Sequence, residues 1–299
     1  MFNKITIFGV GLIGGSFALS LKEAGMVGRI VGMERTQEVL ERALQLGLID
    51  EIGISVADAV RDADLVMIAA PVAQTGNILA SILPHLQPGT IVTDAGSTKS
   101  DVVAAARATL GDKIGQFIPG HPIAGREMNG PEAAIPDLFI GKKTVLTPLP
   151  ENSPQDVETI SQAWVACGAI IHTLTPQDHD CVFAAVSHLP HLLAYALVDN
   201  IIKKPKADLL FEYAASGFRD FTRIAGSSPE MWRDITLANQ TMLLGMLDSY
   251  LLQLHRMRDL VASGDGPAIQ EVYANAQRAR QNWIRTIESA EQQNREGGD

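Results

Sequence analysis

Short apolar runs alternate with amphipathic segments through the first half of the chain. The segment 36–47, TQEVLERALQLG, shows a helical pattern, because its apolar residues recur every three or four positions and a glycine ends it. A second helix is predicted at 14–25. Strand–helix alternation of this kind is typical of a parallel sheet with helices on both faces. The runs that predict strands are KITIFGV (4–10), RIVGME (29–34), ADLVMIAAP (63–71), GTIVTDAGS (89–97), GQFIPGHP (115–122), KKTVLTP (142–148) and AIIHTLTP (169–176).

The second half of the chain changes to helical patterns. The first of its predicted helices is apolar and is interrupted by Pro190, where we expect a kink because proline lacks the backbone donor. The second opens with a serine cap and a proline in its first turn. We therefore expect an α/β domain at 1–170 and an all-α helical domain at 171–299. The predicted helices lie at 178–202, 227–263 and 268–287.

The composition is that of a globular protein, since 46% of the 299 residues are hydrophobic and 19% are charged. The net charge of -10 opposes binding to nucleic acid or to an anionic membrane surface. Cys167 and Cys181 form no C-x-x-C pair, so neither a zinc site nor a redox motif is indicated. We recognise no signal sequence and no run of about 18 apolar residues. We therefore expect a cytoplasmic protein with no membrane or nucleic-acid partner.

A glycine-rich loop follows the first predicted strand and opens the first predicted helix, which is the context that the G-x-G-x-x-G motif requires. The first glycine permits a tight turn, the second lets a pyrophosphate approach the backbone, and the third lets the helix pack on the strand. The helix N-terminus then faces the phosphates. We expect a Rossmann-type doubly wound parallel sheet that binds a dinucleotide here. The residues of the loop are Gly9, Gly11, Leu12, Ile13 and Gly14, with Val10 between the first two.

Residues at the end of the second strand bear on which dinucleotide is bound. Glu34 lies 20 residues after Gly14, where an acidic side chain grips the ribose hydroxyls, and it favours NAD because it would repel a 2′-phosphate. Arg35 and Thr36 come next and would accept such a phosphate, so NADP stays an alternative. Pro71, at the end of the third strand, is predicted to contact the same cofactor.

Polar side chains follow two further strands at the edge where the cofactor is expected. Ser97 and Lys99 follow the strand at 90–93, and His121 follows the strand at 115–119. Since the carboxyl ends of parallel strands meet at one edge of a sheet, Ser97 and His121 could meet over the nicotinamide. An imidazole with a near-neutral pKa takes a hydroxyl proton as a hydride leaves, and a serine hydroxyl orients that histidine or the substrate alcohol. A lone loop histidine is more often a surface residue, but this position favours function.

The long apolar helix carries the polar sequence SHLPH. Ser187 and His191 are four residues apart, and His188 and His191 are three apart, so the three side chains are neighbours on the helix surface. Their apolar surroundings indicate that they point into a cleft. A core histidine with a satisfied hydrogen bond describes His188 better than His191. No third ligand has matching spacing, so no metal site is predicted.

Arginines are concentrated between residues 216 and 234. Their planar guanidinium groups suit bidentate recognition of a carboxylate. Asp220 and Asp234 lie in the same segment and could pair with some of them. We expect one arginine to be free for a substrate acid. The candidates are Arg219, Arg223 and Arg233.

Five segments, in this order and spacing, resemble the prephenate dehydrogenase family, which includes the cyclohexadienyl and arogenate dehydrogenases of tyrosine biosynthesis. They are GVGLIGGS, DAGSTK, GHPIAGRE, SHLPH and GFRDFTRIAGSSPEMWRD. The last three are more specific than the glycine loop, and the resemblance runs from about residue 4 to 285. It implies an oxidative decarboxylation. A hydride leaves the hydroxyl-bearing ring carbon for the nicotinamide, carbon dioxide leaves the opposite carbon, and the ring becomes aromatic.

The resemblance also implies roles for single residues. His121 matches the catalytic histidine that bonds the ring hydroxyl and accepts its proton, and Ser97 matches the serine that assists it. Arg223 matches the arginine that binds a substrate carboxylate. His191 matches a second histidine that contacts the substrate, and Trp232 lines the pocket. The helical domain is the dimer interface of the family, which implies a homodimer. Further residues assigned to the substrate site are Ser187, Arg126 and Glu127.

Arg126 and Glu127 depart from the Thr-Glu pair that many family members carry after HPIAG. By the resemblance they lie near the part of the substrate that differs between prephenate, a keto acid, and arogenate, an amino acid. Arg126 would favour the keto-acid side chain or a dinucleotide phosphate, whereas Glu127 could pair with Arg126 or attract the ammonium of arogenate. We therefore expect an NAD-dependent prephenate dehydrogenase, with arogenate or dual specificity and NADP use as alternatives.

Two other classes of protein fit part of the pattern. A β-hydroxyacid dehydrogenase has a similar layout but relies on a catalytic lysine in its helical domain. Here the lysines of that domain, Lys203, Lys204 and Lys206, lie in a turn around a proline. A non-catalytic dinucleotide sensor would need no acid–base group near the nicotinamide, and the set of His121, Ser97 and Arg223 argues against it.

Overall fold

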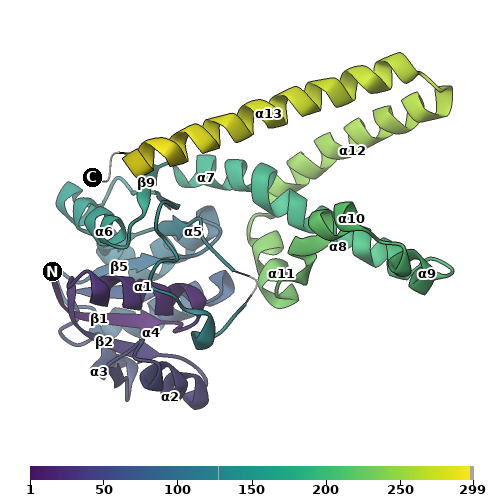
Figure 1. Cartoon of the computed structure of the whole chain (residues 1–299). Coiled ribbons are helices and arrows are strands. Elements are labelled where there is room, and N and C mark those ends of the chain that lie inside the picture. The colour runs from purple at the N-terminus through teal and green to yellow at the C-terminus, as the bar shows by residue number, and fades with distance from the viewer. Residues whose placement is uncertain (127, 297–299) are drawn as a thin grey trace. The chain divides into compact units, whose positions relative to one another are not determined.

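The computed structural model describes the backbone of residues 1–126 and 128–296, and the side chains of these residues as far as 287. Contacts within the chain divide it into two compact units, Met1–Leu243 and Leu244–Asp299. Figure 1 labels their helices and strands. The predicted domain boundary at residues 170 and 171 lies within the first unit and stays a prediction.

The predicted Rossmann-type sheet is confirmed. In the described part of the chain, six strands form one parallel sheet in the order β3-β2-β1-β4-β5-β6. The chain builds this sheet outward in both directions from its centre, so β1 and β4 meet at the topological switch point where such sheets bind ligands. The strands are β1 (Phe2–Phe8), β2 (Val27–Met33), β3 (Glu51–Ile52), β4 (Leu65–Ile68), β5 (Ile91–Asp94) and β6 (Phe117–Ile118).

Helices cover both faces of this sheet. In β4, Leu65 and Met67 belong to one apolar core, whereas Val66 and Ile68 belong to the other. Successive side chains of a strand point to opposite faces, so a strand buried on both sides reads as a continuous apolar run. The first core includes α1 (Leu12–Glu23), α2 (Gln37–Gln45) and α6 (Pro154–Ala166), and the second includes α3 (Val56–Val60), α4 (Thr75–Ile82) and α5 (Ser100–Leu110).

The strands after Pro119 form a second sheet and do not extend the first. Among the described residues, β7 (Gly120–Pro122) pairs antiparallel with β8 (Lys143–Leu146), which pairs parallel with β9 (Ile170–Thr173). The predicted strand unit at 115–122 is thus two short strands in different sheets. Pro119 separates them, because a proline cannot donate to a strand ladder. The change of sheet re-aims the backbone just before His121.

The predicted apolar helix is continuous from α7 (Pro176–Phe183) to α8 (Leu189–Ile202), and its irregularity precedes Pro190. The two helices are joined by a π-helical turn, Ala184–His188, in which the N–H of Leu189 donates to the carbonyl of Ala184. The irregularity expected at Pro190 therefore lies in the turn just before it, and the kink itself stays a prediction. The wider turn accommodates a residue that has no N–H to give and changes the register of α8 relative to α7.

The segment Pro176–Ile202 is long and apolar enough to cross a membrane by length and composition alone, since an 18-residue stretch of it has a mean hydropathy of 1.7, with 22% of that stretch buried. The expectation that no such segment occurs is wrong on this measure. One helix of this kind is weak evidence for a membrane protein. Its buried residues His179, Asp180 and His188 bond to other parts of the first unit, as described below.

The helix predicted over 227–263 is two helices. α11 (Pro229–Ala238) begins as predicted, since the hydroxyl of Ser228 accepts the N–H of Met231 at 3.3 Å. It ends at Asn239, whose side-chain amide donates to the carbonyl of Asp180 at 2.8 Å, and α12 (Gln240–Ser263) follows. This bond joins residues far apart in the sequence, so the local pattern contains no sign of the break. The short helices before α11 are α9 (Ala207–Glu212) and α10 (Ser216–Thr222).

The second unit consists of the rest of α12 and of α13 (Gly266–Glu296). Gly264 ends α12 with a positive φ of 68°, a conformation that glycine adopts without strain. Several large apolar side chains of this unit are exposed. They are Leu244, Leu251, Leu252, Leu254, Val261, Tyr273 and Trp283.

Candidate active site

The glycine loop has the geometry that a pyrophosphate needs. Gly9 has a φ of 95°, and a Cβ there would lie 2.6 Å from the carbonyl oxygen of Ala69. A Cβ on Gly14 would overlap the carbonyl oxygen of Gly9, whereas a Cβ on Gly11 would meet none of the described atoms within 4 Å. Gly11 also caps α1 without a side-chain bond, so the first N–H groups of the helix stay open to an anion. Open space above a bare helix N-terminus fits a dinucleotide pyrophosphate.

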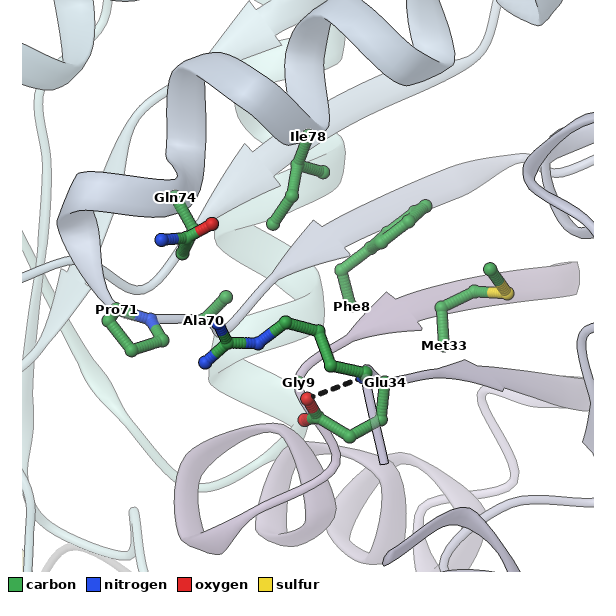
Figure 2. A pocket seen from close by; sticks show the side chains of 9 residues that line it. Phe8, Gly9, Met33, Glu34, Ala70, Pro71, Gln74 and Ile78 are labelled. Carbon is green, nitrogen blue, oxygen red and sulfur yellow. Dashed lines mark hydrogen bonds between the residues drawn. The ribbon is translucent and has the colours of Figure 1, made fainter. Parts of the chain in front are cut away.

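A pocket of about 210 Å³ continues from this loop. Figure 2 shows that the ends of β1, β2 and β4 and the start of the following helical segment line it. Its wall is mainly apolar, and Glu34 supplies a carboxylate whose Oε1 accepts the N–H of Arg35 at 2.8 Å. An apolar slot beside a carboxylate fits the adenosine half of a dinucleotide. The lining residues are Phe8, Gly9, Met33, Glu34, Arg35, Ala70, Pro71, Gln74 and Ile78.

Four of the residues predicted to bind the cofactor therefore meet at this pocket, namely Gly9, Glu34, Arg35 and Pro71. Leu12 and Ile13 lie in the first turn of α1, where their side chains pack against the apolar core. Their backbone N–H groups, and not their side chains, are what this position offers to a ligand.

His121 lies in β7, which is held close to the end of β5 by hydrogen bonds to the side-chain carboxylate of Asp94. The N–H of Gly120 donates to Oδ1 of Asp94 at 3.1 Å, and the N–H of Gly96 donates to Oδ2 of the same carboxylate at 2.8 Å. The ammonium group of Lys99 forms an ion pair with Asp94, and both side chains are fully buried. Asp94 therefore fixes the loop of Ser97 and the strand of His121 to one another.

His121 is linked to two residues of α7 that the sequence analysis missed. Nδ1 of His121 lies 2.8 Å from Nε2 of His179, and Nδ1 of His179 lies 2.8 Å from Oδ1 of Asp180. The two histidines are 58 residues apart in the sequence. The only signal in the sequence is the polar triplet DHD at the start of an otherwise apolar helix.

Asp180 also caps α5. Its Oδ1 accepts the N–H of Lys99 at 2.8 Å, and its Oδ2 accepts the N–H of Ser100 at 2.7 Å. Burial alone would raise the pKa of Asp180, but the bonds from His179 and from the helix N-terminus outweigh it and lower the pKa. The carboxylate is therefore ionised at neutral pH.

Burial lowers the pKa of the two histidines, whereas it raises the pKa of a carboxyl group. Burial lowers the pKa of His121 well below the ordinary value, and the repulsion that protonated His179, Lys99 and protonated His188 would exert acts in the same direction. Burial also lowers the pKa of His179, although its bond to Asp180 opposes the shift. Both rings are therefore neutral at pH 7, and a neutral imidazole has one nitrogen that accepts a proton.

Ser97 lies in the loop between β5 and α5. In the described part of the chain no hydrogen bond joins its side chain to His121, whose ring nitrogen contacts His179. The predicted orientation of His121 by Ser97 is therefore not seen, and His179 occupies that place. The backbone of Ser97 bonds to His188, so it is still part of the same cluster.

His188 is buried, at 2% exposure, and its Nδ1 lies 3.1 Å from the side-chain nitrogen of Asn239. It is therefore a satisfied core histidine, as the sequence indicated. The ring of His191 stacks on Trp232, with centroids 3.5 Å apart and planes at 18°. Nδ1 of His191 bonds to the carbonyl of Ser187 at 2.8 Å. The indole Nε1 of Trp232 is buried with no hydrogen-bond partner among the described atoms, as a group that awaits a ligand would be.

The burial of His188 predicts a loss of stability in acid. Burial lowers its pKa to about 4, so the unfolded chain binds this proton first as the pH falls below 6.5. The free energy of unfolding should fall between pH 6.5 and 4 by up to about 3 kcal/mol from this residue. The variant His188→Gln keeps a donor and an acceptor but does not titrate. Urea unfolding at pH 7 and pH 4.5 should give a smaller loss for the variant, and equal losses would contradict the prediction.

The three candidate arginines differ in their partners. Arg233 bonds to Oδ1 of Asp234 at 2.6 Å, so it is held by a neighbouring carboxylate. Arg219 is exposed, and its Nε lies 3.9 Å from Oδ1 of Asp220. Arg223 ends α10 near His191, since its charge contributes to the lowered pKa of that histidine after the larger effect of burial. Among the three candidates, Arg223 is thus the one whose charge acts on the ring of His191.

Of the pair Arg126 and Glu127, only Arg126 is among the described residues. Arg126 is exposed, and its Nη1 lies 3.5 Å from the carbonyl of Ala133. Glu127 lies outside the described residues. Within the described residues, no group of three histidine, cysteine, aspartate or glutamate side chains is arranged to hold a metal ion.

Two family models match this chain. The one described as prephenate dehydrogenase, nucleotide-binding domain matches residues 17–173, and the one described as prephenate dehydrogenase, dimerization domain matches residues 175–275. The cyclohexadienyl dehydrogenase of Zymomonas mobilis is 36% identical over 282 residues, which are 94% of this chain and 96% of that protein.

Solved structures agree with these matches. Prephenate dehydrogenase from A. aeolicus, in complex with hydroxyphenyl propionate and NAD+, has a TM-score of 0.88 and 36% identity, with 94% of this chain and 98% of that chain covered. Arogenate dehydrogenase from Synechocystis has a TM-score of 0.79 and 30% identity, with 94% and 99% covered.

Proposed function

The chain belongs to the prephenate dehydrogenase family, and we propose that it converts prephenate to 4-hydroxyphenylpyruvate with NAD, in tyrosine biosynthesis. It is an oxidoreductase of a cyclohexadienyl substrate, and its nucleotide-binding domain binds NAD. One observation carries the proposal. His121 is a neutral, partly buried imidazole next to the end of β5, where a hydroxyl proton must be taken as the hydride leaves.

The bound cofactor and the residues of the site have separate roles in the reaction. Bound NAD supplies the hydride acceptor. His121 accepts the proton of the ring hydroxyl, so that the hydroxyl-bearing carbon becomes a carbonyl as its hydride departs. Loss of carbon dioxide from the opposite carbon returns an electron pair to the ring, which leaves a phenolate, and the phenolate takes back the proton held by His121 to give the phenol. Since aromatisation supplies much of the driving force, positioning and a base are the main demands on the protein.

The substrate carries at least two negative charges, so an acidic protein needs local cations to bind it. We assign one substrate carboxylate to Arg223, which can hold it by two parallel N–H donors. The His191–Trp232 stack forms the wall beside it, and the unpartnered Nε1 of Trp232 supplies a further donor. Ser187 and Ser97 are assigned to the same pocket, with Ser97 acting on the substrate alcohol.

The variant Arg223→Ala should raise the KM for prephenate by about 10- to 100-fold and leave the KM for NAD nearly unchanged, because a charge-assisted bidentate bond contributes about 1.5–3 kcal/mol. Arg223→Lys should recover only part of this, since an ammonium group lacks the fork geometry. Arg61→Ala, which removes an exposed arginine on the surface near α3, is the matched control. Unchanged KM values in steady-state assays of Arg223→Ala would make Arg223 a structural residue.

The choice between substrates and cofactors is also a proposal. Glu34 lines the cofactor pocket and favours NAD, because it repels a 2′-phosphate; Arg35 beside it is the residue that would admit NADP. Arg126 favours the keto acid prephenate by its charge. Dual specificity is the second candidate, supported by the 36% identity to a cyclohexadienyl dehydrogenase. Initial rates with prephenate or arogenate, each with NAD or NADP, test all four combinations. No turnover in any of them would refute the proposed function.

We further assign the exposed apolar side chains of α12 and α13 to a homodimer interface, which would remove them from water. The family model for residues 175–275 describes a dimerization domain. Light scattering should give about twice the mass of the 32.1 kDa chain. We assign the protein to the cytoplasm, with no membrane or nucleic-acid partner.

A further inference from the structure

We propose that His179 and Asp180 are positioning residues that fix the tautomer of His121, with the proton on Nδ1 and the lone pair on Nε2. This inference rests on the proposed function only in one respect, namely that His121 is the base. It identifies the atom that acts as the base and the two residues that hold it ready. Neither residue contacts the substrate in this proposal, and each acts through His121.

The chain of bonds starts at Asp180, which is ionised. Its two oxygens accept the N–H groups of Lys99 and Ser100 at the positive end of α5. A carboxylate is an acceptor only, so the 2.8 Å contact with Nδ1 of His179 requires a proton on that nitrogen.

The tautomer of His179 then determines that of His121. A neutral ring with its proton on Nδ1 has its lone pair on Nε2, so Nε2 of His179 is an acceptor. It lies 2.8 Å from Nδ1 of His121, which must therefore be the donor. The lone pair of His121 is left on Nε2. Each proton position follows from the previous one, and the first follows from the ionised Asp180 at the N-terminus of α5.

Phe183 holds the two rings in place. Its ring centroid lies 4.9 Å from that of His121 and 4.5 Å from that of His179, and the two histidine rings are 5.0 Å apart. It lies one helical turn after His179, so the backbone of α7 sets both contacts. The rings are thereby restrained from flipping, which would exchange donor and acceptor nitrogens.

The same series of hydrogen bonds stabilises His121 after it has taken the proton. The protonated ring keeps its Nδ1–H bond to His179, and the negative charge of Asp180 lies beyond it. The burial of the site and the positive charge of Lys99 oppose this stabilisation of protonated His121, because both lower its pKa. The hydrogen-bonded series Asp180–His179–His121, which we call the relay, therefore supports proton transfer by orientation and by a modest charge effect, as a buried carboxylate does behind other catalytic histidines.

The variant His179→Phe tests the inference, because it keeps an aromatic ring against Phe183 but offers no acceptor to His121. We expect kcat to fall by about 10- to 100-fold, with the KM for NAD unchanged. His179→Gln offers an amide oxygen to His121 and an amide N–H to Asp180. It should recover kcat to within a few-fold of the wild type. Equal losses in both variants would assign the effect to packing and overturn the relay.

Nitrogen-15 NMR of the imidazole rings gives a readout that does not need turnover. In the wild type at pH 7, the His121 ring, assigned by its loss in His121→Asn, should show a protonated Nδ1 and a bare Nε2. His179→Phe should give a mixture of tautomers, and His179→Gln should restore one. A bare Nδ1 in the wild type would refute the relay. If the tautomer is as proposed but no substrate is turned over, the proposed function fails and the relay stands.

Discussion

The variant His121→Asn is expected to lose at least about 99% of its turnover with prephenate while it still binds NAD. General-base catalysis by a placed side chain contributes about 100- to 10,000-fold, and asparagine at this position has no lone pair of comparable basicity. The cofactor pocket is formed by other strand ends, so the dissociation constant for NAD, measured by fluorescence titration, should change little. His172→Asn, an exposed histidine on β9, is the matched control.

The pH profile of the wild type supplies a second check on the same residue. His121 must be neutral to accept a proton, and burial lowers its pKa, with repulsion from protonated His179, from Lys99 and from protonated His188 acting in the same direction. The rate constant kcat/KM should therefore stay level as the pH falls through 6.5 and decline only at lower pH. Normal turnover in His121→Asn, or a decline that starts above pH 6.5, would exclude His121 as the base.

The variant Lys99→Met is expected to lower the free energy of unfolding by about 3–5 kcal/mol. Lys99 and Asp94 form a buried ion pair, with exposures of 0% and 1%, and the loss of one partner leaves the other charge uncompensated in the interior. The backbone bonds from Gly96 and Gly120 to Asp94 remain but do not neutralise it. Urea unfolding followed by circular dichroism measures the loss.

The double variant Asp94→Asn/Lys99→Met separates the charge effect from the loss of packing. It removes both charges, so it should recover a substantial part of the stability that Lys99→Met loses. Turnover should fall in both variants, because the same carboxylate anchors the backbone next to His121. A double variant no more stable than Lys99→Met would show that packing and hydrogen bonds, not charge, dominate at this position.

The parts of the structure that could be predicted from the sequence are those specified by residues close together in the chain. The glycine loop needs three glycines within six residues, and Glu34 follows from the length of one strand–helix–strand unit. The alternation of apolar runs and amphipathic helices predicted the parallel sheet, because a strand buried on both faces must be apolar throughout. The cap at Ser228 was equally local, since it depends on an N–H three residues away.

The parts that could not be predicted depend on contacts between distant residues. His179 was not identified, because it lies in α7 and its partner His121 is 58 residues away in β7. The break between α11 and α12 depends on a bond from Asn239 to the backbone of α7. The π-helical turn before Pro190 is one of several ways to accommodate a proline, and the local sequence does not distinguish among them.

Asp180 has consequences for how such an enzyme can change its substrate over evolutionary time. The same carboxylate completes the N-terminus of α5 and orients the histidine pair, so a substitution there would weaken folding and catalysis together. Selection would remove such changes whichever substrate is favoured. Arg126 is exposed and has a single long contact to a backbone carbonyl, so its replacement carries little cost to the fold. Inherited differences in specificity are therefore expected to accumulate around Arg126, and the apparatus behind His121 to stay fixed.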